Sequence, residues 1–577
     1  MNRIDHAVIG GLLLLLGAIA LLIGAPALGG ATATPSPQAS AANVVPYREG
    51  ILGRPVAVSP LAARTQADRD LVALVFSGLV ARGPNGALVP ALAERWTVDP
   101  TGRTWTFSLD PDARWQDGTP VTAQDVVYTV NVLRNPEYSG PGAGSWREVT
   151  ATIVDEQTVR FDLGTPLGGF LELATQPIAP AHLLDSIPVS ELADDPFGRA
   201  PIGSGPYVLT ELDDDHAVLL PAASVDLGAP GTEGTSAPIP SDPLATTTPT
   251  RRPDVAQPKL DRIEFRFFDS PADLASAFEG GELDAVSGLQ AAEAEDLADS
   301  GPVAQALRYP GTTLTTVLLN LRPSHPELRD PAVRTALLQA LDRQSIATKA
   351  FGESAVVAQA PIPPTSWAFD MAASAAVATD ATAATTAFTT AGWTKVDERW
   401  RPPGAKEAYT LEILSPDAEM NPALFAVAEQ VAEGWDAFGL STQVVQADAS
   451  APMADRLRKG EFAATVVDIS IGHDPDLYPL LASSQTQTGG LNVSGVQDAA
   501  LDALLVAARQ PGTDEARKAA YTALQTQLAT GRYLLPIAFA DEVVVARDTL
   551  DDVVVQPVSD GSDRFWDVLT WRLANDR

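Results

Sequence analysis

The sequence predicts an α/β protein with more than one packed unit, preceded by a hydrophobic amino-terminal segment. The chain has 577 residues, which exceeds what one hydrophobic core usually organises. Stretches in which apolar and polar residues alternate recur along the chain, between stretches with helical spacing of apolar residues. Apolar residues make up 45% of the chain and charged residues 19%, which is typical of a globular protein.

The amino-terminal segment is long and apolar enough to interact with a membrane. Residues 7–28 carry no charge, and about 20 apolar residues in a helix span a bilayer. We therefore expect residues 1–28 to form a transmembrane anchor; the alternative is a signal segment cleaved at the small residues 31–33. Residues 29–46, rich in Ala, Pro, Ser and Thr, are expected to be a flexible spacer. With either alternative, Tyr47 and the residues after it lie outside the cytoplasm.

Local patterns in the first half of the body predict strands, a capped helix and an insertion. Residues 104–109 alternate between apolar and polar types, as do residues 152–163, and both stretches predict strands. Residues 123–134 have helical spacing, and Thr122 is placed to cap that helix. Residues 224–258 are dominated by Pro, Thr, Ser, Gly and Ala, so we expect a disordered surface insertion there.

The second half again alternates between strand and helix patterns. Asp330 followed by Pro331 predicts the start of a helix over residues 331–342, since Asp caps helices and Pro is favoured at the first helical position. Residues 372–392 resemble a linker in their Ala and Thr content. We nevertheless expect the part nearest Gly392 to be helical and to end at that glycine.

The charge balance and the missing cysteines exclude several functions. The chain has 39 Lys and Arg against 73 Asp and Glu, a net charge of -34, so nucleic acid is not an expected partner. The absence of cysteine excludes disulfides, thiolate metal sites and cysteine nucleophiles.

No pattern typical of a catalytic or metal site is present, and the sequence predicts no enzyme, no cofactor and no metal. No two of the five histidines have the spacing of metal ligands. His473 stands beside Asp474 and Asp476, where it either assists a metal or a proton transfer or is a polar loop residue.

Several segments between residues 55 and 571 form an ordered series. They include residues 88–96, Trp115-Gln116-Asp117-Gly118-Thr119-Pro120, Pro201-Ile202-Gly203-Ser204-Gly205-Pro206-Tyr207, Gly281-Glu282-Leu283-Asp284-Ala285, residues 330–343, residues 361–367 and Ala391-Gly392-Trp393. Each segment alone is a weak signal, but the series in this order resembles one family: the large dipeptide- and oligopeptide-type extracellular solute-binding proteins of ABC importers, family 5.

The resemblance implies a two-lobed periplasmic-binding-protein-like fold of type II, in its large peptide-binding subclass. Residues 47–288 would form the first lobe, with a subdomain over residues 70–170, and residues 289–540 the second lobe. Residues 541–577 would return to the first lobe.

The function implied is that of the substrate-binding component of an ABC importer. It would capture a small solute, peptide-like or another nutrient, between closing lobes and deliver it to permease subunits. The protein would be a monomer at the extracytoplasmic face of the cell membrane, anchored through residues 7–28 because the lipid-anchoring cysteine of many relatives is missing. Signal cleavage would instead make it secreted or periplasmic.

The resemblance also implies candidate site residues, none of them catalytic. Residues 471–478 correspond to a ligand-capping segment, with Ile471 where peptide-binding relatives have an acid and with Asp474 and Asp476 nearby, so a free peptide amine is in doubt. Asn492 falls where the family often lines the cleft. Trp367, after a proline-rich loop, either covers the ligand or closes the edge of a core.

Gly203, Ser204 and Gly205 are candidate hinge residues, since glycines provide backbone freedom; an ordinary turn leading into a strand is the alternative.

Two other functions stay open from the sequence. A secreted hydrolase would need a nucleophile, a base and an orienting group that converge in one pocket. A membrane-tethered sensory or adhesion module on the same fold would be favoured if protein side chains filled the cleft, or if the insertion at residues 224–258 covered it.

Overall fold

A computed structural model describes residues 45–142, 145–225, 257–301, 303–406, 409–419, 421–447, 450–487 and 490–574. The predicted anchor, almost all of the predicted spacer and most of the predicted insertion lie outside the described residues. Among the helices that are described, none is both long and apolar enough to cross a membrane. The described residues belong to one compact unit that starts at Val45.

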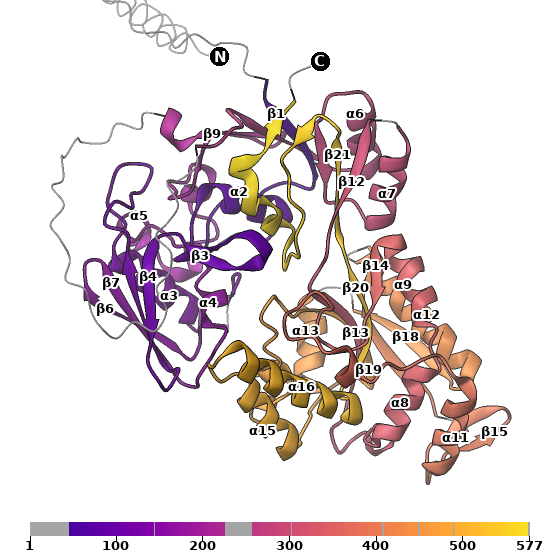
Figure 1. Cartoon of the computed structure of the whole chain (residues 1–577). Helices are drawn as coiled ribbons and strands as arrows, with labels where there is room; N and C mark the ends of the chain where they lie inside the picture. Colours follow the sequence, from indigo (N-terminus) through magenta and orange to yellow (C-terminus); the bar gives the residue numbers. More distant parts are fainter. Residues whose placement is uncertain are drawn as a thin grey trace, which may run out of the picture. The chain divides into compact units, whose positions relative to one another are not determined.

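A seven-stranded mixed sheet organises the first lobe (Figure 1). Its central strand β1 pairs in parallel with β10 on one side and with β11 on the other, and the remaining pairs are antiparallel. The strands, in their order across the sheet, are β12 (Ala304–Tyr309), β21 (Glu542–Arg547), β11 (Ala285–Ser287), β1 (Tyr47–Leu52), β10 (Ile263–Phe268), β9 (His216–Pro221) and β8 (Tyr207–Leu212).

A four-stranded antiparallel sheet forms a subdomain of this lobe and confirms the predicted alternation. Trp105, Phe107 and Leu109 on β5 are buried, whereas the polar residues between them are half-buried. The stretch 152–163 is not one strand but the two arms of a hairpin, because β6 pairs antiparallel with β7. The sheet consists, in order, of β4 (Ala93–Val98), β5 (Thr104–Leu109), β7 (Thr158–Leu163) and β6 (Val149–Asp155), and a small hairpin joins β2 (Val80–Arg82) to β3 (Leu88–Pro90).

The second lobe is built around a six-stranded mixed sheet with its own hydrophobic core. In this sheet β17 is parallel to β18 and β19, and the other pairs are antiparallel. Its strands, in order, are β14 (Ala355–Val357), β20 (Leu535–Ala540), β13 (Thr313–Leu319), β19 (Ala464–Ser470), β17 (Leu411–Pro416) and β18 (Thr442–Ala447).

Helices cover the sheets of both lobes and begin at caps that local sequence specifies. Thr122 and Asp125 form a capping box for α3, and Asp330 caps α8 with Pro331 at its first turn, which confirms both predicted starts. In the first lobe the main helices are α2 (Gln66–Val75), α3 (Ala123–Arg134), α6 (Pro271–Glu279), α7 (Ala291–Asp299) and the 3₁₀ helix η8 (Gly561–Thr570). In the second lobe they are α8 (Pro331–Gln339), α9 (Arg343–Phe351), α11 (Ala381–Thr390), α12 (Pro422–Phe438), α13 (Ser450–Lys459), α15 (Ala499–Ala508) and α16 (Asp514–Gly531).

The chain crosses twice between the two large sheets, and both crossings are very short. Residues 310–312 join β12 to β13, and Asp541 joins β20 to β21. The crossings lie against each other, since a Cβ atom on Gly311 would stand 2.0 Å from the carbonyl oxygen of Ala540. The first lobe therefore includes β12, which pairs with β21, and α7, which packs against β21 beside α6 (Figure 1). The family resemblance had implied that the second lobe begins at residue 289, so this boundary lies later in the chain than expected.

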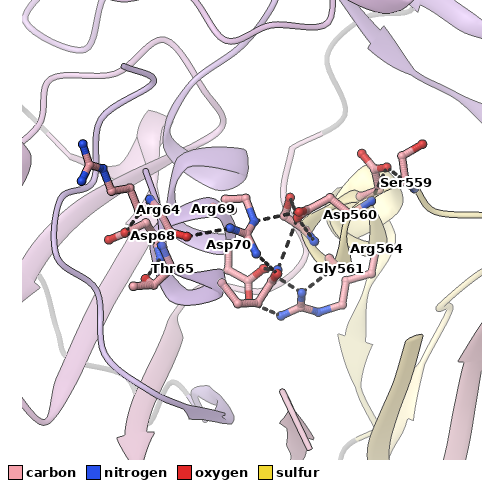
Figure 2. A network of polar contacts seen from close by, with 12 residues as sticks. Arg64, Thr65, Asp68, Arg69, Asp70, Ser559, Asp560, Gly561 and Arg564 are labelled. Carbon is pink, nitrogen blue, oxygen red and sulfur yellow. Dashed lines mark hydrogen bonds and ion pairs between the residues drawn. The ribbon is translucent and has the colours of Figure 1, made fainter. Parts of the chain in front are cut away.

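The carboxy-terminal segment is held in the first lobe by buried ion pairs (Figure 2). Arg564 of η8 donates to both carboxylate oxygens of Asp70 on α2, at 2.8 and 2.7 Å, and to Glu49 on β1 at 2.7 Å. The side chain of Arg564 is 3% exposed and those of its two partners are 0% exposed. One guanidinium thus compensates carboxylates from the first strand and the first helix of the lobe.

Replacing Arg564 with Met should lower the free energy of unfolding by about 3–5 kcal/mol, because two buried carboxylates would lose their common cation. The free energy is measured by urea denaturation. The matched change Arg572→Met removes an ion pair with Asp552 whose side chains are 57% and 38% exposed, and it should cost less than about 1 kcal/mol. Equal losses for the two variants would contradict the role given to the buried pairs.

Candidate functional site

A cavity of about 780 Å³ lies within the first lobe. Its walls come from α2, the β2–β3 hairpin, α4 (Phe170–Leu173) and η8, and from the loop residues 141, 142, 145, 146, 175–177 and 204–206. Much of its lining is apolar, with Phe76, Trp146, Phe565 and Leu569 among the larger side chains. Pockets for small molecules in proteins have volumes of roughly 300–1,000 Å³ and similarly apolar walls, so the cavity has the size and character of a ligand site.

Arg82, at the end of β2, is the central polar group of the cavity wall. Its Nη2 donates to Glu172 at 2.6 Å, and its Nε lies 3.6 Å from Asp563 of η8. Its Nη1 is buried and has no hydrogen-bond partner, and the side chain is 10% exposed. Because buried donors in folded proteins are nearly always paired, this donor is an exception, and it exposes almost no surface to the cavity.

The two carboxylates beside Arg82 are held in surroundings that disfavour their charge. Burial raises the pKa of Glu172, against the lowering effect of Arg82, and the charges of Asp474 and Asp563 raise it further. Burial also raises the pKa of Asp563, against the lowering effects of Arg82 and of the backbone N–H groups of Ser559 and Asp560, which donate to its Oδ2 at 2.7 and 3.3 Å. One arginine therefore compensates two carboxylates that also repel each other.

The predicted ligand-capping segment lies after β19 in the second lobe, and the structure gives both of its acids a cation. Arg517 of α16 donates to both carboxylate oxygens of Asp474, at 2.8 and 2.7 Å. Asp476 lies 3.1 Å from Arg509, and burial raises the pKa of this carboxyl. Both acids therefore have an arginine partner in this structure.

Trp367 lies in the same cluster as Asp474. The guanidinium of Arg517 lies 4.5 Å from the centre of the Trp367 ring, and Tyr521 meets that ring edge-on at 5.2 Å. Trp367 keeps 37% of its surface exposed, so it covers this cluster without being part of a core.

The capping segment faces the cavity wall of the first lobe. The backbone N–H of Gly168 donates to the carbonyl oxygen of Arg509 at 2.7 Å, and Arg509 donates to the Thr165 hydroxyl at 3.1 Å. The Nε2 of His473 lies 4.0 Å from a carboxylate oxygen of Asp563 and has no hydrogen-bond partner. Burial, with a smaller effect of Arg82, lowers the pKa of His473 from 6.5 to about 3, so the imidazole is neutral.

Asn492, predicted to line the cleft, has a structural role instead. It is 2% exposed, and its amide nitrogen donates to the carbonyl oxygens of Leu481, Ala482 and Val496, at 3.0–3.2 Å. Its amide oxygen accepts from the backbone N–H of Val496 at 3.0 Å. The hydrogen bonds of this amide are directed at the loop that contains it, and Asn492 does not line the cavity described above.

The predicted hinge residues also lie elsewhere than at the chain crossings. A Cβ atom on Gly203 would stand 1.9 Å from the carbonyl oxygen of Val75, and one on Gly205 would stand 2.6 Å from that of Leu74. These glycines let the backbone pack against the end of α2, and Ser204 accepts from the N–H of Ser77 at 3.2 Å. Ser204 and Gly205 line the cavity, whereas the crossings are at residues 310–312 and 541.

Sequence reasoning missed the three charged residues that meet in the cavity wall. Glu172 is a single acid in the apolar run 170–173, and Arg82 ends an apolar stretch. Such isolated charges are a weak signal, since the three residues come from segments far apart in the chain and only the fold brings them together.

Because His473 is neutral when folded, stability should fall as the pH drops from about 6.5 towards 3, where the unfolded chain binds the additional proton. The His473→Gln variant has no imidazole, so its unfolded chain cannot bind this proton. Between pH 7 and pH 4 it should therefore lose about 2–3 kcal/mol less unfolding free energy than the parent protein. Urea denaturation at both pH values measures the difference, and parallel pH profiles for the two proteins would contradict the buried, neutral state of His473.

Known structures share this fold over most of their length. The oligopeptide-binding protein AppA from Bacillus subtilis, solved in complex with a nonapeptide, has a TM-score of 0.69 at 20% identity, covering 92% of this chain and 99% of AppA. NikZ from Campylobacter jejuni, solved in complex with Ni(L-His), has a TM-score of 0.68 at 20% identity, covering 91% of this chain and 99% of NikZ.

Comparison of sequences points to the same group of proteins. The chain is 24% identical over 539 residues to the oligopeptide-binding protein AppA of Bacillus subtilis (strain 168), covering 91% of each protein. The model of a family described as bacterial extracellular solute-binding proteins, family 5 Middle, matches residues 87–490, more than half of the 577 residues. The chain therefore belongs to family 5 of the bacterial extracellular solute-binding proteins.

Proposed function

We propose that this protein captures a small solute in the cavity of its first lobe, under the capping segment of its second lobe, and delivers it to the permease of an ABC importer. The observation that carries this proposal is the cavity of about 780 Å³, whose largely apolar wall approaches the capping segment where His473 lies 4.0 Å from Asp563. Membership of a solute-binding family supports binding without turnover.

The arrangement of the two lobes supports capture by closure. Each lobe has its own hydrophobic core, and the two chain crossings are short and adjacent. A few residues at such crossings can absorb a rotation of one rigid body against another. We propose residues 310–312 and 541 as the hinge, with Gly311 providing the close approach to Ala540.

The chemical identity of the solute is the next part of the proposal. AppA of Bacillus subtilis was solved with a nonapeptide and NikZ with a nickel–histidine complex. The cavity of this chain suits a compact solute, which a short peptide or an amino acid derivative would satisfy. We further propose that the protein acts as a monomer at the extracytoplasmic face of the membrane, tethered through the uncharged residues 7–28.

The proposal is tested by following thermal unfolding of the full-length chain, kept in detergent, against peptides, amino acids, sugars and metal chelates. A solute that binds only the folded protein at about 100 times its dissociation constant adds about 2.7 kcal/mol of stability and raises the unfolding midpoint. If no solute in a broad library raises the midpoint of the folded protein, the proposed function is contradicted.

Filling the cavity should abolish binding without unfolding the lobe. Ala73 of α2 lines the cavity and is only partly buried, so Ala73→Trp places an indole in the solute's space. We expect the increase in midpoint caused by the solute to disappear. The matched variant Ala272→Trp, at an exposed position of α6, should bind normally. Unchanged affinity of Ala73→Trp, measured by isothermal titration calorimetry, would place the solute outside this cavity.

A further inference from the structure

The second lobe contains three buried arginines that have no carboxylate partner. The buried arginines in the described part of the chain are Arg334, Arg343, Arg532 and Arg564, between 3% and 7% exposed. Arg564, in the first lobe, forms ion pairs with two carboxylates, whereas the other three form none with the described residues. Because a buried charge is costly without compensation, each of these three arginines must be stabilised in another way.

Neutral oxygen acceptors compensate two of the three. Arg334 donates to four carbonyl oxygens at 2.7–3.1 Å, two of which lie at the end of α16. Arg343 donates to the carbonyl oxygens of Pro536 and Val377 at 3.0 and 2.7 Å, and to the side-chain oxygen of Gln359 at 3.3 Å. The partial negative charge at the end of α16 is thus already used by Arg334.

Arg532, which follows α16, is the exception. Its Nη2 donates to the carbonyl oxygen of Ala375 at 2.7 Å, and this is the only hydrogen bond from its side chain to a described residue. Its Nε is buried without a partner, and the residue is 7% exposed. Burial and, to a smaller extent, the charge of Arg532 lower the pKa of Arg343 to about 10, so both guanidinium groups stay charged at neutral pH and repel each other.

A small cavity lies beside Arg532. Its volume is about 10 Å³, close to the space that a single water-sized ligand needs, and no acidic residue lines it. Gln359 and Ala529 in its wall are only half-buried, so the cavity lies directly beneath the surface of the lobe and solvent ions can reach it.

The other polar side chains of this wall are already satisfied. The hydroxyl groups of Ser374 and Tyr533 and the amide group of Gln525 have hydrogen-bond partners at 2.6–3.2 Å. Arg532 is therefore the group in the wall that combines a full charge with unused donors.

The size of the cavity and the sign of the charge together define the ligand class. A water molecule can accept a hydrogen bond, but it brings no charge, so the repulsion between Arg532 and Arg343 would persist. Carboxylates and phosphates bring the charge, but their several heavy atoms exceed a space of about 10 Å³. A monatomic anion agrees with both the charge and the space.

We propose that the second lobe binds one small monovalent inorganic anion, of the chloride type, in the cavity lined by Arg532 and Gln359. The anion accepts from the unused donors of Arg532 and offsets the repulsion between Arg532 and Arg343. Since these two arginines donate to Val377 and Ala375 at one end of the segment that contains Trp367, and Arg343 to Gln359 at its other end, the anion also stabilises that segment. The site is separate from the cavity of the first lobe and does not depend on the proposed function.

Thermal unfolding of the full-length chain, kept in detergent, tests the site with chloride as the probe. Sodium chloride is compared with sodium gluconate at equal ionic strength, so that general screening is the same and only chloride is small enough for the cavity. We expect the unfolding midpoint to be higher by about 2 °C at a chloride concentration of about ten times the dissociation constant, with a saturating dependence on concentration.

Two variants assign this increase to the cavity. In Arg532→Gln the same change of salt measures its general effect on the solvent, and the chloride-specific increase should disappear. The matched variant Arg572→Gln removes an arginine whose side chain is 57% exposed and should keep the increase. The linewidth of the chloride NMR signal is a second measurement, because exchange with a protein site broadens it; the parent protein and Arg572→Gln should broaden it more than Arg532→Gln.

Each outcome decides for or against the anion. Equal salt effects in the parent protein and Arg532→Gln, without additional broadening, would mean that the cavity holds water only, and they would overturn the inference. A chloride effect that survives in Arg532→Gln would place the anion elsewhere and would overturn it too. If Arg532→Gln does not fold, the unaltered protein decides: bromide should then reduce the broadening of the chloride signal in a saturable way, and no such competition contradicts the site.

Discussion

The ion pairs of Arg564 with Asp70 and Glu49 are the interaction on which the rest of the first lobe depends. They join η8 to β1 and α2, at positions where water is excluded. Because a buried charge without its partner is strongly unfavourable, the carboxy-terminal segment has little freedom to dock in another register. Phe565 and Leu569, in the same segment, are then fixed as walls of the cavity, and Asp563 is fixed beside Arg82.

The path of the chain has a second consequence for function. Since the carboxy-terminus must return to the first lobe, the backbone passes between the lobes twice, and both passages are adjacent. Each lobe keeps its own sheet and its own core, so neither depends on the other for most of its burial. The pairing of β21 with β11 and β12 returns the chain to the first lobe and completes the two-stranded connection about which we propose that the lobes rotate.

The candidate site combines a largely apolar space with a small group of charged residues. Arg82 has an unpaired buried donor, and Glu172 and Asp563 share its charge. Asp474 and Asp476 on the opposite side are satisfied by Arg517 and Arg509. The wall of the first lobe thus combines a largely apolar surface with a few charged groups, and on this basis we propose that the solute binds there.

Local sequence determined much of the secondary structure, because caps and alternation act over a few residues. Neighbouring residues account directly for the capping box of Thr122 and Asp125, for the start of α8 at Asp330 and Pro331, and for the buried face of β5. The helix predicted to reach residue 342 ends at Gln339, since Asp342 caps a separate helix, α9. The family was also evident, because its segments recur in a fixed order along the chain.

The tertiary structure decided the position of every candidate site residue. Glycines at residues 203 and 205 suggest a hinge in the sequence, yet their missing side chains are needed for packing against α2, and the crossings lie at Gly311 and Asp541. Asn492 is a polar residue that could line a cleft, but its hydrogen bonds are made within its own loop. Trp367 and Asp474 are brought together because both contact Arg517. Arg82, Glu172 and Asp563 carry no recognisable motif, because they come from segments far apart in the chain and form ion pairs only once the chain is folded.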